Sequence, residues 1–391
     1  MKALVYFHHG RSLGHTRRAL TLARAIAACP AVNNVLLVCG GEYPRHFQAL
    51  QDFDLVQLPA MGPVPGTLFG GLHPLNLSGS NRRVLRLRQR LLETLVDRYA
   101  PRLLVTELFP FGRRWLRGEI TALIVAARQR ARRCCVVSSM RDVLGLASHK
   151  VTRGYRARLS RSAALFDQLW IHGDPTFLPL EYRFSSAVES RLRYTGYLDE
   201  GGRPARRRRG GRVPRIVIHA GGGKDAEALL DGSLAALARL GKTQRFAATL
   251  ATGPFLPERA FRRLAGRAAA LGAVELVRFE PDLRPRLAAA DLSVSTCGYN
   301  TFLDLVQSGV PAVVVPRSAE PEQSLRAERW AALGGCVAVA KPQPAALHRA
   351  MVQALSSRPP PLAIDVGGAV QVTQIVGELL GQRSGPSRRR A

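Results

Sequence analysis

The sequence has few lysines, few acidic residues and few aromatic residues for its length of 391. Only five lysines occur among 57 basic residues, so arginine carries nearly all of the formal net charge of +29. Such an excess fits either a compositional bias of the genome or contact with an anionic membrane surface. We expect no nucleic-acid partner, because no basic segment interleaved with aromatic residues accompanies the charge.

Cysteines are also few, and long apolar runs are missing. The six cysteines have no CxxC spacing and lie mostly in apolar segments, which predicts buried, reduced thiols instead of a disulfide framework. No apolar run approaches the roughly 20 residues of a membrane-spanning helix. Met1 and Lys2 lead directly into an apolar run, so we expect no signal peptide. These features predict a cytoplasmic protein, with peripheral contact to the inner membrane face left open.

Length and patterning indicate the domain number. A chain of this length with 46% hydrophobic residues has room for two globular domains. Short apolar runs alternate with amphipathic helical patterns in both halves, which is typical of α/β proteins with parallel sheets. We predict a Rossmann-like domain over residues 1–200, a linker at 201–214, a second Rossmann-like domain over 215–363, a helix at 364–382 and a disordered basic tail at 383–391.

The segment from Pro59 to Ser80, PAMGPVPGTLFGGLHPLNLSGS, interrupts this alternation. It is so rich in glycine and proline that we predict a loop without regular structure. The sequence leaves three alternatives open for its larger apolar residues: they line an acceptor pocket, they contact a membrane, or they pack on the domain's own surface. They are Met61, Leu68, Phe69 and Leu72.

The most informative stretch covers residues 291–323. An apolar strand pattern, a turn at Cys297-Gly298, an amphipathic helix pattern and a second apolar strand predict a parallel βαβ unit. Ligands of open α/β sheets bind at the carboxyl ends of the strands, and a helix N-terminus there favours an anion. Asp304, two turns into the helix, can accept hydrogen bonds from a ribose diol. This combination predicts a sugar-nucleotide site.

The same stretch resembles the donor site of MurG-like glycosyltransferases. The sequences GYNT at 298–301 and EQSLRAER at 322–329 resemble more closely a group of predicted bacterial glycosyltransferases related to MurG. The resemblance implies a GT-B enzyme with two Rossmann-like domains facing a cleft, a last helix that crosses back onto the first domain, and a UDP-linked sugar donor. The matching residues are Ser295, Gly298, Thr301, Asp304, Gly309, Pro311, Pro316, Glu322 and Gln323.

A glycine-rich loop, Gly221-Gly222-Gly223-Lys224, follows the first predicted strand of the second domain. Glycines allow a pyrophosphate to approach the backbone, and Lys224 adds a positive charge. The loop stands where MurG-like enzymes carry a similar diphosphate loop, although those enzymes usually have a small polar residue and glutamine after two glycines. The resemblance assigns the ribose to Asp304 and sugar hydroxyls to Glu322 and Gln323; alternatively, Glu322 and Gln323 belong to an ordinary polar loop. Gly14, Cys297 and Gly298 are further candidate donor contacts, and Asn300 and Thr301 either bind phosphate or only cap their helix.

The run GRSLGH, from Gly10 to His15, resembles the first glycine-rich loop of the same family. His15 falls at the start of the first helix, where the helix dipole disfavours the imidazolium ion. A neutral imidazole can accept a proton, so His15 is the candidate general base for the acceptor hydroxyl. Alternatively, it only forms a hydrogen bond with the loop or with the diphosphate.

Two further acidic residues follow predicted strands of the first domain. Glu107 and Asp142 are alternative bases or acceptor-orienting groups, and Arg141 and Phe109 are candidate acceptor contacts; Arg141 and Asp142 can also form a purely structural pair. The segment Asp52-Phe53-Asp54 matches a DXD metal signature, but it precedes a strand, so we interpret it as a turn. We expect no metal ion and no cofactor.

These features predict an inverting, metal-independent glycosyltransferase. It transfers a hexose or N-acetylhexosamine from a nucleoside-diphosphate sugar to an acceptor hydroxyl, as a monomer or homodimer. One alternative is a nucleotide-sugar 2-epimerase of the same fold. Another is a non-catalytic protein that binds nucleotide-sugars or an anionic surface, in which Arg206–Arg209 and the tail provide the contacts.

Overall fold

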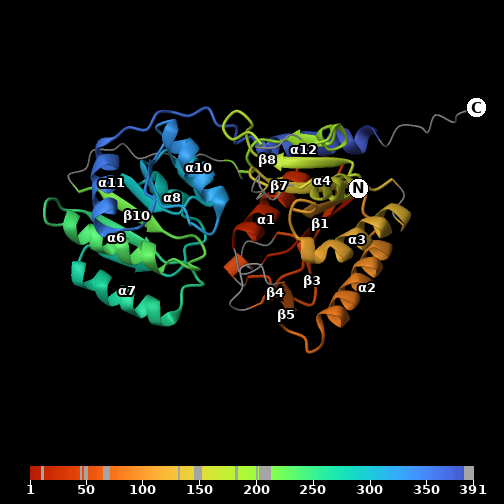
Figure 1. The fold of residues 1–391 in the computed structure, drawn as a ribbon, viewed down its shortest axis with the longest axis horizontal. Coiled ribbons are helices and arrows are strands. Elements are labelled where there is room, and N and C mark those ends of the chain that lie inside the picture. Colours follow the sequence, from red (N-terminus) through yellow and green to blue (C-terminus); the bar gives the residue numbers. More distant parts are fainter. Residues whose placement is uncertain are drawn as a thin grey trace, which may run out of the picture. The chain divides into compact units, whose positions relative to one another are not determined.

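The computed structural model describes residues 1–9, 13–44, 46–47, 52–64, 71–130, 133–144, 152–180, 184–199, 201 and 213–382. The chain divides into two compact units (Figure 1): unit 1 is Met1–Gly201 with Asp365–Ala391, and unit 2 is Gly202–Ile364. Each unit is an α/β structure built on a parallel sheet, so the predicted fold class is confirmed. The predictions for Leu68, Phe69, Arg206–Arg209 and the tail lie outside the described residues.

Unit 1 alternates strands and helices along the chain. Its strands are β1 (Lys2–Phe7), β2 (Asn34–Cys39), β3 (Asp54–Gln57), β4 (Met61–Pro63), β5 (Leu72–Pro74), β6 (Leu103–Glu107), β7 (Cys135–Arg141), β8 (Gln168–His172) and β9 (Leu192–Tyr194). Its helices are α1 (Leu13–Ala27), α2 (Asn81–Tyr99), α3 (Arg117–Arg130), which follows a 3-10 turn at Arg114–Leu116, α4 (Arg153–Ala163), α5 (Ser186–Glu189) and α12 (Gly368–Gln382).

The main sheet of unit 1 has the strand order β3-β2-β1-β6-β7-β8-β9, with parallel pairing throughout. The chain builds outward from β1 in one direction and from β6 in the other. The strand order therefore reverses between β1 and β6, and ligands of such sheets bind at this reversal, beyond the carboxyl ends of the strands. His15 lies in the segment that follows β1, and Glu107 is the last residue of β6.

Alternating apolar residues of the buried strands supply two cores. Leu4 and Tyr6 of β1 face the core formed with α2 and α3, whereas Val5 and Phe7 face the core formed with α1 and α12. Helix α12, at the blue end of the colour scale, lies on this second face beside α1 (Figure 1). Thr373 Oγ1 of α12 donates a hydrogen bond to the backbone of α1.

A fully buried ion pair lies between α2 and α3. The Arg88 guanidinium donates to both carboxylate oxygens of Glu119, at 2.7 Å each, and to the carbonyls of Gly40 and Pro59 at 2.6 Å. Tyr6 of β1 donates its hydroxyl to Glu119 at 2.5 Å. The network ties the two helices to the ends of β1 and β2, and it was not anticipated from the sequence.

The prediction of no regular structure between Pro59 and Ser80 was wrong for part of the segment. β4 and β5 form a short antiparallel hairpin in which Gly62 pairs with His73. Prolines stand only at its outer positions, where a strand tolerates a missing N–H donor. Met61 is buried, which places it in the domain's own packing and not in an acceptor pocket or at a membrane.

Unit 2 repeats the architecture with different sequence. Its strands are β10 (Arg215–His219), β11 (Ala247–Ala251), β12 (Val274–Val277), β13 (Leu292–Ser295), β14 (Ala312–Val314) and β15 (Val337–Ala338). Its helices are α6 (Glu227–Leu240), α7 (Glu258–Leu271), α8 (Arg284–Ala288), α9 (Tyr299–Ser308), α10 (Pro321–Ala332) and α11 (Pro344–Ser356).

The sheet of unit 2 has the order β12-β11-β10-β13-β14-β15 and is also parallel. Its strand order reverses between β10 and β13. The loops after these two strands therefore flank the position where ligands of open α/β sheets bind. Beneath this edge, Ile216 and Ile218 of β10 pack in the core that α6, α7 and α11 cover.

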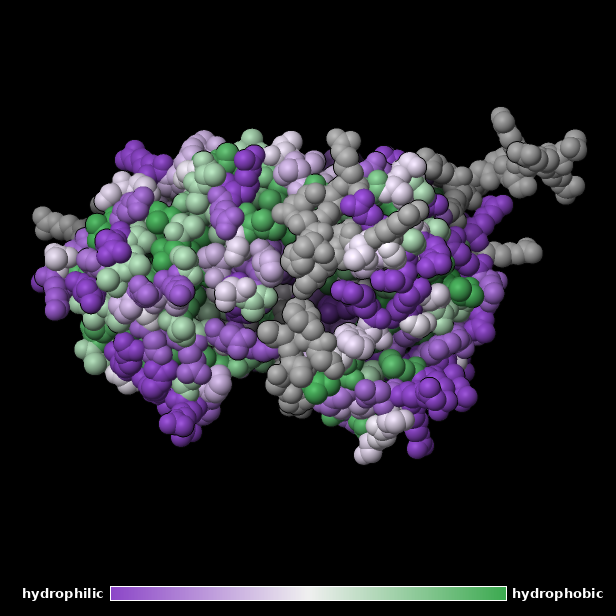
Figure 2. Space-filling view, in the orientation of Figure 1, coloured by the Kyte–Doolittle hydropathy of each residue, from purple (hydrophilic) through white to green (hydrophobic). Residues whose placement is uncertain are grey.

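Arginines on exposed helix faces account for part of the positive charge. Hydrophilic colour is dense over α2 in the visible face (Figure 2), where Arg82, Arg83, Arg86, Arg90 and Arg98 are exposed. Across the described residues, every helix is too short or too polar to cross a membrane. The six cysteines are free thiols; five are buried and Cys336 is partly buried.

Candidate functional site

In unit 1, the two strongest catalytic candidates lie in direct contact. His15 Nδ1, in the first turn of α1, lies 2.6 Å from Glu107 Oε1 at the end of β6. Arg18, one helical turn after His15, forms a hydrogen-bonded ion pair with Glu107. Arg113 Nη2 lies 3.2 Å from Glu107 Oε2 and 3.3 Å from His15 Nε2. The site is therefore an imidazole and a carboxylate enclosed by two guanidinium groups.

The turn after β6 brings Arg113 back to Glu107. Leu108 and Arg113 both adopt positive φ values, +63° and +58°, which L-residues rarely occupy. Gly112 closes the turn by donating its backbone N–H to the Leu108 carbonyl at 2.6 Å. Residues in this conformation persist only where the surroundings hold them, and they concentrate at functional sites.

Burial in this cluster keeps His15 neutral. Burial lowers the pKa of His15 to about 3. The charge of Glu107 raises this pKa, but Arg113 and Arg18 lower it and so cancel part of the effect of Glu107. Burial alone would raise the pKa of Glu107, but His15 and Arg18 hold it well below its usual range. Glu107 is therefore ionised and accepts the Nδ1–H proton, which leaves Nε2 as the acceptor nitrogen of the ring. The His15 side chain is 15% exposed, so solvent reaches it.

The other predicted residues of unit 1 lie outside this cluster. Asp142 is buried and accepts hydrogen bonds from the Tyr197 hydroxyl at 2.9 Å and the Val143 N–H at 3.0 Å, so it holds its own loop. Phe109 is a core residue that packs on Phe166, with ring centroids 6.0 Å apart, instead of an exposed acceptor contact. Arg141 ends β7 and is partly buried.

In unit 2, the glycine-rich loop interlocks with the loop after β11. Gly221 and Gly223 have φ values of +60° and +84°, which explains the need for glycine. The backbone of Gly253 approaches so closely that a Cβ there would lie 2.4 Å from the Gly222 carbonyl carbon. Phe255 N–H donates to Gly222 O at 2.9 Å. A Cβ on Gly221 would meet no atom of the described residues within 4 Å, so one side of the loop is open to them.

Gln323 joins two loops of the same edge. Its Oε1 accepts the N–H of Cys297 at 3.3 Å and the N–H of Arg317 at 3.2 Å, and its amide nitrogen donates to Glu320. Arg326 Nη1 donates to the Cys297 carbonyl at 2.6 Å. The structure thus uses Gln323 to position the loops, and the predicted contact with sugar hydroxyls stays a prediction.

Helix α9 begins immediately after Cys297, with Gly298 as its N-cap. Gly298 provides no side chain to cap the helix, and the first turn of α9 contains no acidic residue. Asn300 and Thr301 of that turn are partly buried, and so is Glu322 in the first turn of α10. An uncapped N-terminus at the strand reversal suits an anionic ligand.

Asp304 is only 6% exposed and lies near His219, the last residue of β10. Burial lowers the pKa of His219 to about 4, so its imidazole is neutral, and within the described part of the chain its Nε2 has no hydrogen-bond partner. Lys224 is exposed at the tip of the glycine-rich loop, and Gly14 is partly buried in α1 of unit 1. The structure brings the loops of each unit together at one sheet edge.

Three arginines of these sites were not predicted from the sequence: Arg18, Arg113 and Arg317. Arg18 follows His15 at the i+3 spacing that places two residues on one helix face, and this signal was available in the sequence. Arg113 and Arg317 each follow a strand by a few residues, but no sequence pattern shows where such long side chains point. Asp52, part of the DXD match, pairs instead with Arg24 at 2.9 Å. The described residues contain no cluster of three or more metal-ligating side chains.

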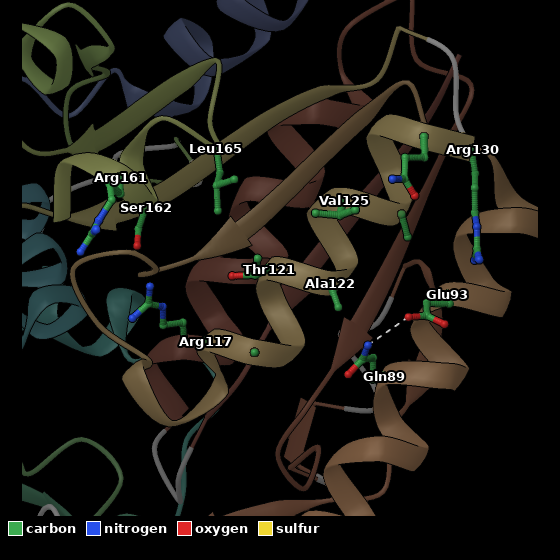
Figure 3. Close-up of a pocket in the computed structure, with 13 residues that line it drawn as sticks. Gln89, Glu93, Arg117, Thr121, Ala122, Val125, Arg130, Arg161, Ser162 and Leu165 are labelled. Carbon is green, nitrogen blue, oxygen red and sulfur yellow. Dashed lines mark hydrogen bonds between the residues drawn. The ribbon is translucent and has the colours of Figure 1, made fainter. Parts of the chain in front are cut away.

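A groove of about 830 Å³ lies elsewhere in unit 1, along the exposed face of α3 (Figure 3). Arg117 and Arg161 mark one end, Arg130 marks the other, and a hydrogen bond of 3.1 Å joins Gln89 to Glu93 at its rim. Its lining comes from helical residues of α2, α3 and α4 and from Leu165. It shares no residue with the two sheet edges described above.

A known protein family matches one of the two units by sequence. Residues 216–358 match the family model "Glycosyltransferase family 28 C-terminal domain". The match covers most of unit 2 and none of unit 1. Among curated proteins, no sequence matches the chain. The narrower resemblance carried by the GYNT and EQSLRAER motifs stays a prediction.

Solved structures share the fold along the whole chain. MurG of Acinetobacter baumannii aligns with a TM-score of 0.60 at 18% identity, covering 97% of this chain and 99% of that one. The Streptomyces sp. SF2575 glycosyltransferase SsfS6 gives 0.55 at 17%, with coverage of 98% and 96%. UDP-GlcNAc 2-epimerase of Methanocaldococcus jannaschii gives 0.58 at 10%, with coverage of 97% and 100%. The fold is therefore the one that GT-B glycosyltransferases share with these epimerases.

Proposed function

We propose that the protein is an inverting glycosyltransferase that transfers a sugar from a nucleoside-diphosphate donor to an acceptor hydroxyl. The observation that carries the proposal is the 2.6 Å contact between His15 and Glu107 at the strand reversal of unit 1. An ionised carboxylate that holds a neutral imidazole is an arrangement suited to proton abstraction. The family match of unit 2 supports the donor half of the proposal.

The proposed reaction is a single displacement. The acceptor oxygen attacks the anomeric carbon, the bond from that carbon to the phosphate oxygen breaks, and the nucleoside diphosphate leaves. The acceptor proton moves to His15 Nε2, and Glu107 stabilises the imidazolium ion that forms. The sugar is a hexose or N-acetylhexosamine in this proposal, and attack opposite the leaving group inverts the anomeric centre.

The donor binds unit 2 in this proposal. The glycine-rich loop and the N-terminus of α9 bind the diphosphate, and Asp304 binds the ribose. Backbone N–H groups and cationic side chains neutralise the negative charge of the diphosphate in this proposal, so it requires no metal ion. UDP is the favoured nucleotide in this proposal. Solved structures of this fold include a UDP complex of S. aureus MnaA, but also a thymidine diphosphate complex of SsfS6.

A nucleotide-sugar panel tests the proposal. Thermal unfolding is measured with UDP, TDP, GDP and ADP, because a ligand that binds the native state raises the apparent stability. We expect one or two of these to raise Tm, and the corresponding nucleotide-sugar to be consumed only when an acceptor is added. His15→Ala should abolish consumption without changing the Tm shift. If none of the four nucleotides changes Tm, the proposal is wrong.

The second candidate is a nucleotide-sugar 2-epimerase, which the fold similarity to UDP-GlcNAc 2-epimerases favours. An epimerase interconverts its nucleotide-sugar without any acceptor. NMR of the nucleotide-sugar incubated with the protein alone therefore distinguishes the two functions. A new 2-epimer would support the epimerase, and an unchanged donor would support the transferase.

A further inference from the structure

Arg317 occupies the sheet edge where the proposed donor site lies. It follows β14, whose neighbour β13 pairs with β10, so the loops after these three strands lie side by side. The Arg317 side chain is 22% exposed. Neither the family resemblance nor the sequence patterns assigned it a role.

The contacts of Arg317 place its guanidinium beside the glycine-rich loop. Nη2 lies 3.4 Å from the carbonyl oxygen of Ala220, the residue before Gly221. Its backbone N–H donates to Gln323 Oε1, which also accepts from Cys297 N–H. One side-chain amide thus fixes both the backbone of Arg317 and the turn that starts α9.

The hydrogen-bonding capacity of Arg317 is only partly used. Nη1 lies 3.2 Å from Glu320 Oε1, three residues along the chain, and the buried Nε–H has no acceptor among the described residues. A guanidinium group has five N–H donors in a planar fork that matches phosphate oxygens. A carboxylate three residues away is a replaceable partner, because an ion pair that is partly exposed to solvent contributes little stability.

We propose that Arg317 binds the diphosphate of the donor, an inference that rests on the proposed function. Without ligand, Glu320 holds the guanidinium at the edge of the glycine-rich loop. When a nucleoside diphosphate binds, phosphate oxygens replace Glu320 on the fork, and Nε–H gains an acceptor. As the anomeric bond breaks, the same group stabilises the additional negative charge on the leaving diphosphate.

The test compares UDP with uridine, which lacks phosphate, for the full-length protein and its variants; TDP with thymidine replaces this pair if only TDP binds. Arg317→Ala should weaken UDP binding by about 10–100-fold and leave uridine binding unchanged. Arg317→Lys keeps the charge but loses the fork, so its UDP affinity should lie between those of the wild type and Arg317→Ala. Isothermal titration and competition binding measure both ligands.

Two controls separate a phosphate contact from loop damage. Glu320→Gln removes the competing carboxylate, so UDP binding should be equal or tighter. Arg239→Ala removes an exposed arginine from the last turn of α6 and should have no effect. If Glu320→Gln weakens UDP as strongly as Arg317→Ala, or if Arg317→Ala weakens uridine equally, the inference is wrong.

Failure of the inference and failure of the proposed function give different results. If the wild type binds no nucleoside diphosphate, the proposed function fails and the inference fails with it. If the wild type binds UDP and both Arg317 variants bind it equally well, only the inference is overturned. If Arg317→Ala does not fold, Arg317→Lys decides: undiminished UDP binding overturns the inference, and a loss specific to UDP supports it.

Discussion

His15 Nδ1 lies 2.6 Å from Glu107 Oε1, which joins the first turn of α1 to the carboxyl end of β6. The contact selects one tautomer of the imidazole. An ionised carboxylate can only accept hydrogen bonds, so the ring nitrogen that contacts it must carry the proton. Arg18 and Arg113 balance the carboxylate, so the ring is neutral before the reaction and can accept a proton at Nε2. Most of the expected chemistry of unit 1 depends on this arrangement.

Replacing Glu107 by glutamine should reduce kcat far more than donor binding. The amide no longer stabilises the imidazolium ion or selects the Nδ1–H tautomer, so we expect a loss of about 10²–10⁴-fold in kcat. Steady-state kinetics with the nucleotide-sugar found in the panel measures it. Glu93→Gln, which removes a carboxylate from α2, is the matched control and should leave kcat unchanged. Equal kcat values for the two variants would contradict the role of Glu107.

The acid side of the pH–rate profile should be flat. Burial holds the pKa of His15 near 3, so the ring of the folded protein is already neutral at pH 6 and above. We therefore expect kcat/KM not to fall between about pH 8 and pH 6, unlike the profile of a base with an ordinary histidine pKa of about 6.5. A decline in kcat/KM with a midpoint near pH 6.5 would contradict this expectation.

Acid should destabilise the fold through its buried histidines. Burial lowers the pKa of His9 and His219 to about 4 and of His15 to about 3, whereas the unfolded chain titrates at the ordinary value. The unfolded state therefore binds more protons below about pH 6.5, and stability falls with pH until the folded values are reached. Each histidine contributes about 1.4 kcal/mol per pH unit in that window. Urea unfolding at pH 8, 7, 6 and 5 measures the trend, and a constant free energy of unfolding would contradict it.

Removing Arg88 should destabilise unit 1 strongly. Arg88→Met leaves the Glu119 carboxylate buried without its cation, which costs about 3–5 kcal/mol. The double variant with Glu119→Leu removes both charges and should recover much of this loss. Arg262→Ala breaks the exposed pair with Glu258 and should cost less than about 1 kcal/mol. Denaturant unfolding compares the three variants, and equal effects of Arg88→Met and Arg262→Ala would contradict the prediction.

A methyl group at Gly253 should disturb the glycine-rich loop. Gly253 has a φ of +88°, and a Cβ there would lie 2.4 Å from the Gly222 carbonyl carbon. Gly253→Ala should therefore lower both stability and nucleoside diphosphate affinity. Gly272→Ala is a matched control, because Gly272 has a φ of +65° but no atom within 4 Å of its Cβ position. It should cost only the backbone strain of about 1–2 kcal/mol and leave nucleotide binding intact.

The buried strands were predictable because their apolar runs are short and bounded. β1, β6, β10 and β13 all follow this pattern, whereas the reversals of strand order between β1 and β6 and between β10 and β13 are seen only in the structure. The β4–β5 hairpin was not predictable, since its glycine and proline content argues against strands. It forms because pairing of three residues needs few N–H donors.

The candidate site was predictable residue by residue but not as a set. His15 and Glu107 each follow a strand, which predicts that both reach the same sheet edge. Their contact depends on the turn after β6, whose positive φ values at Leu108 and Arg113 no local pattern announces. For Gln323, the sequence predicted a contact with sugar hydroxyls. It did not predict the hydrogen bonds that the side chain accepts from the backbone of two loops in the structure.

By itself, the sequence determined the periodicity of burial, and from it the alternation of strands and helices, the parallel sheets and the edges where ligands bind. Only the tertiary structure decided which charges meet. Arg18, Arg113 and Arg317 reach their partners across loops, and a long side chain can point in many directions from the same backbone position. Apolar burial follows from local pattern because it needs only a face, whereas an ion pair needs two specific atoms within about 3 Å.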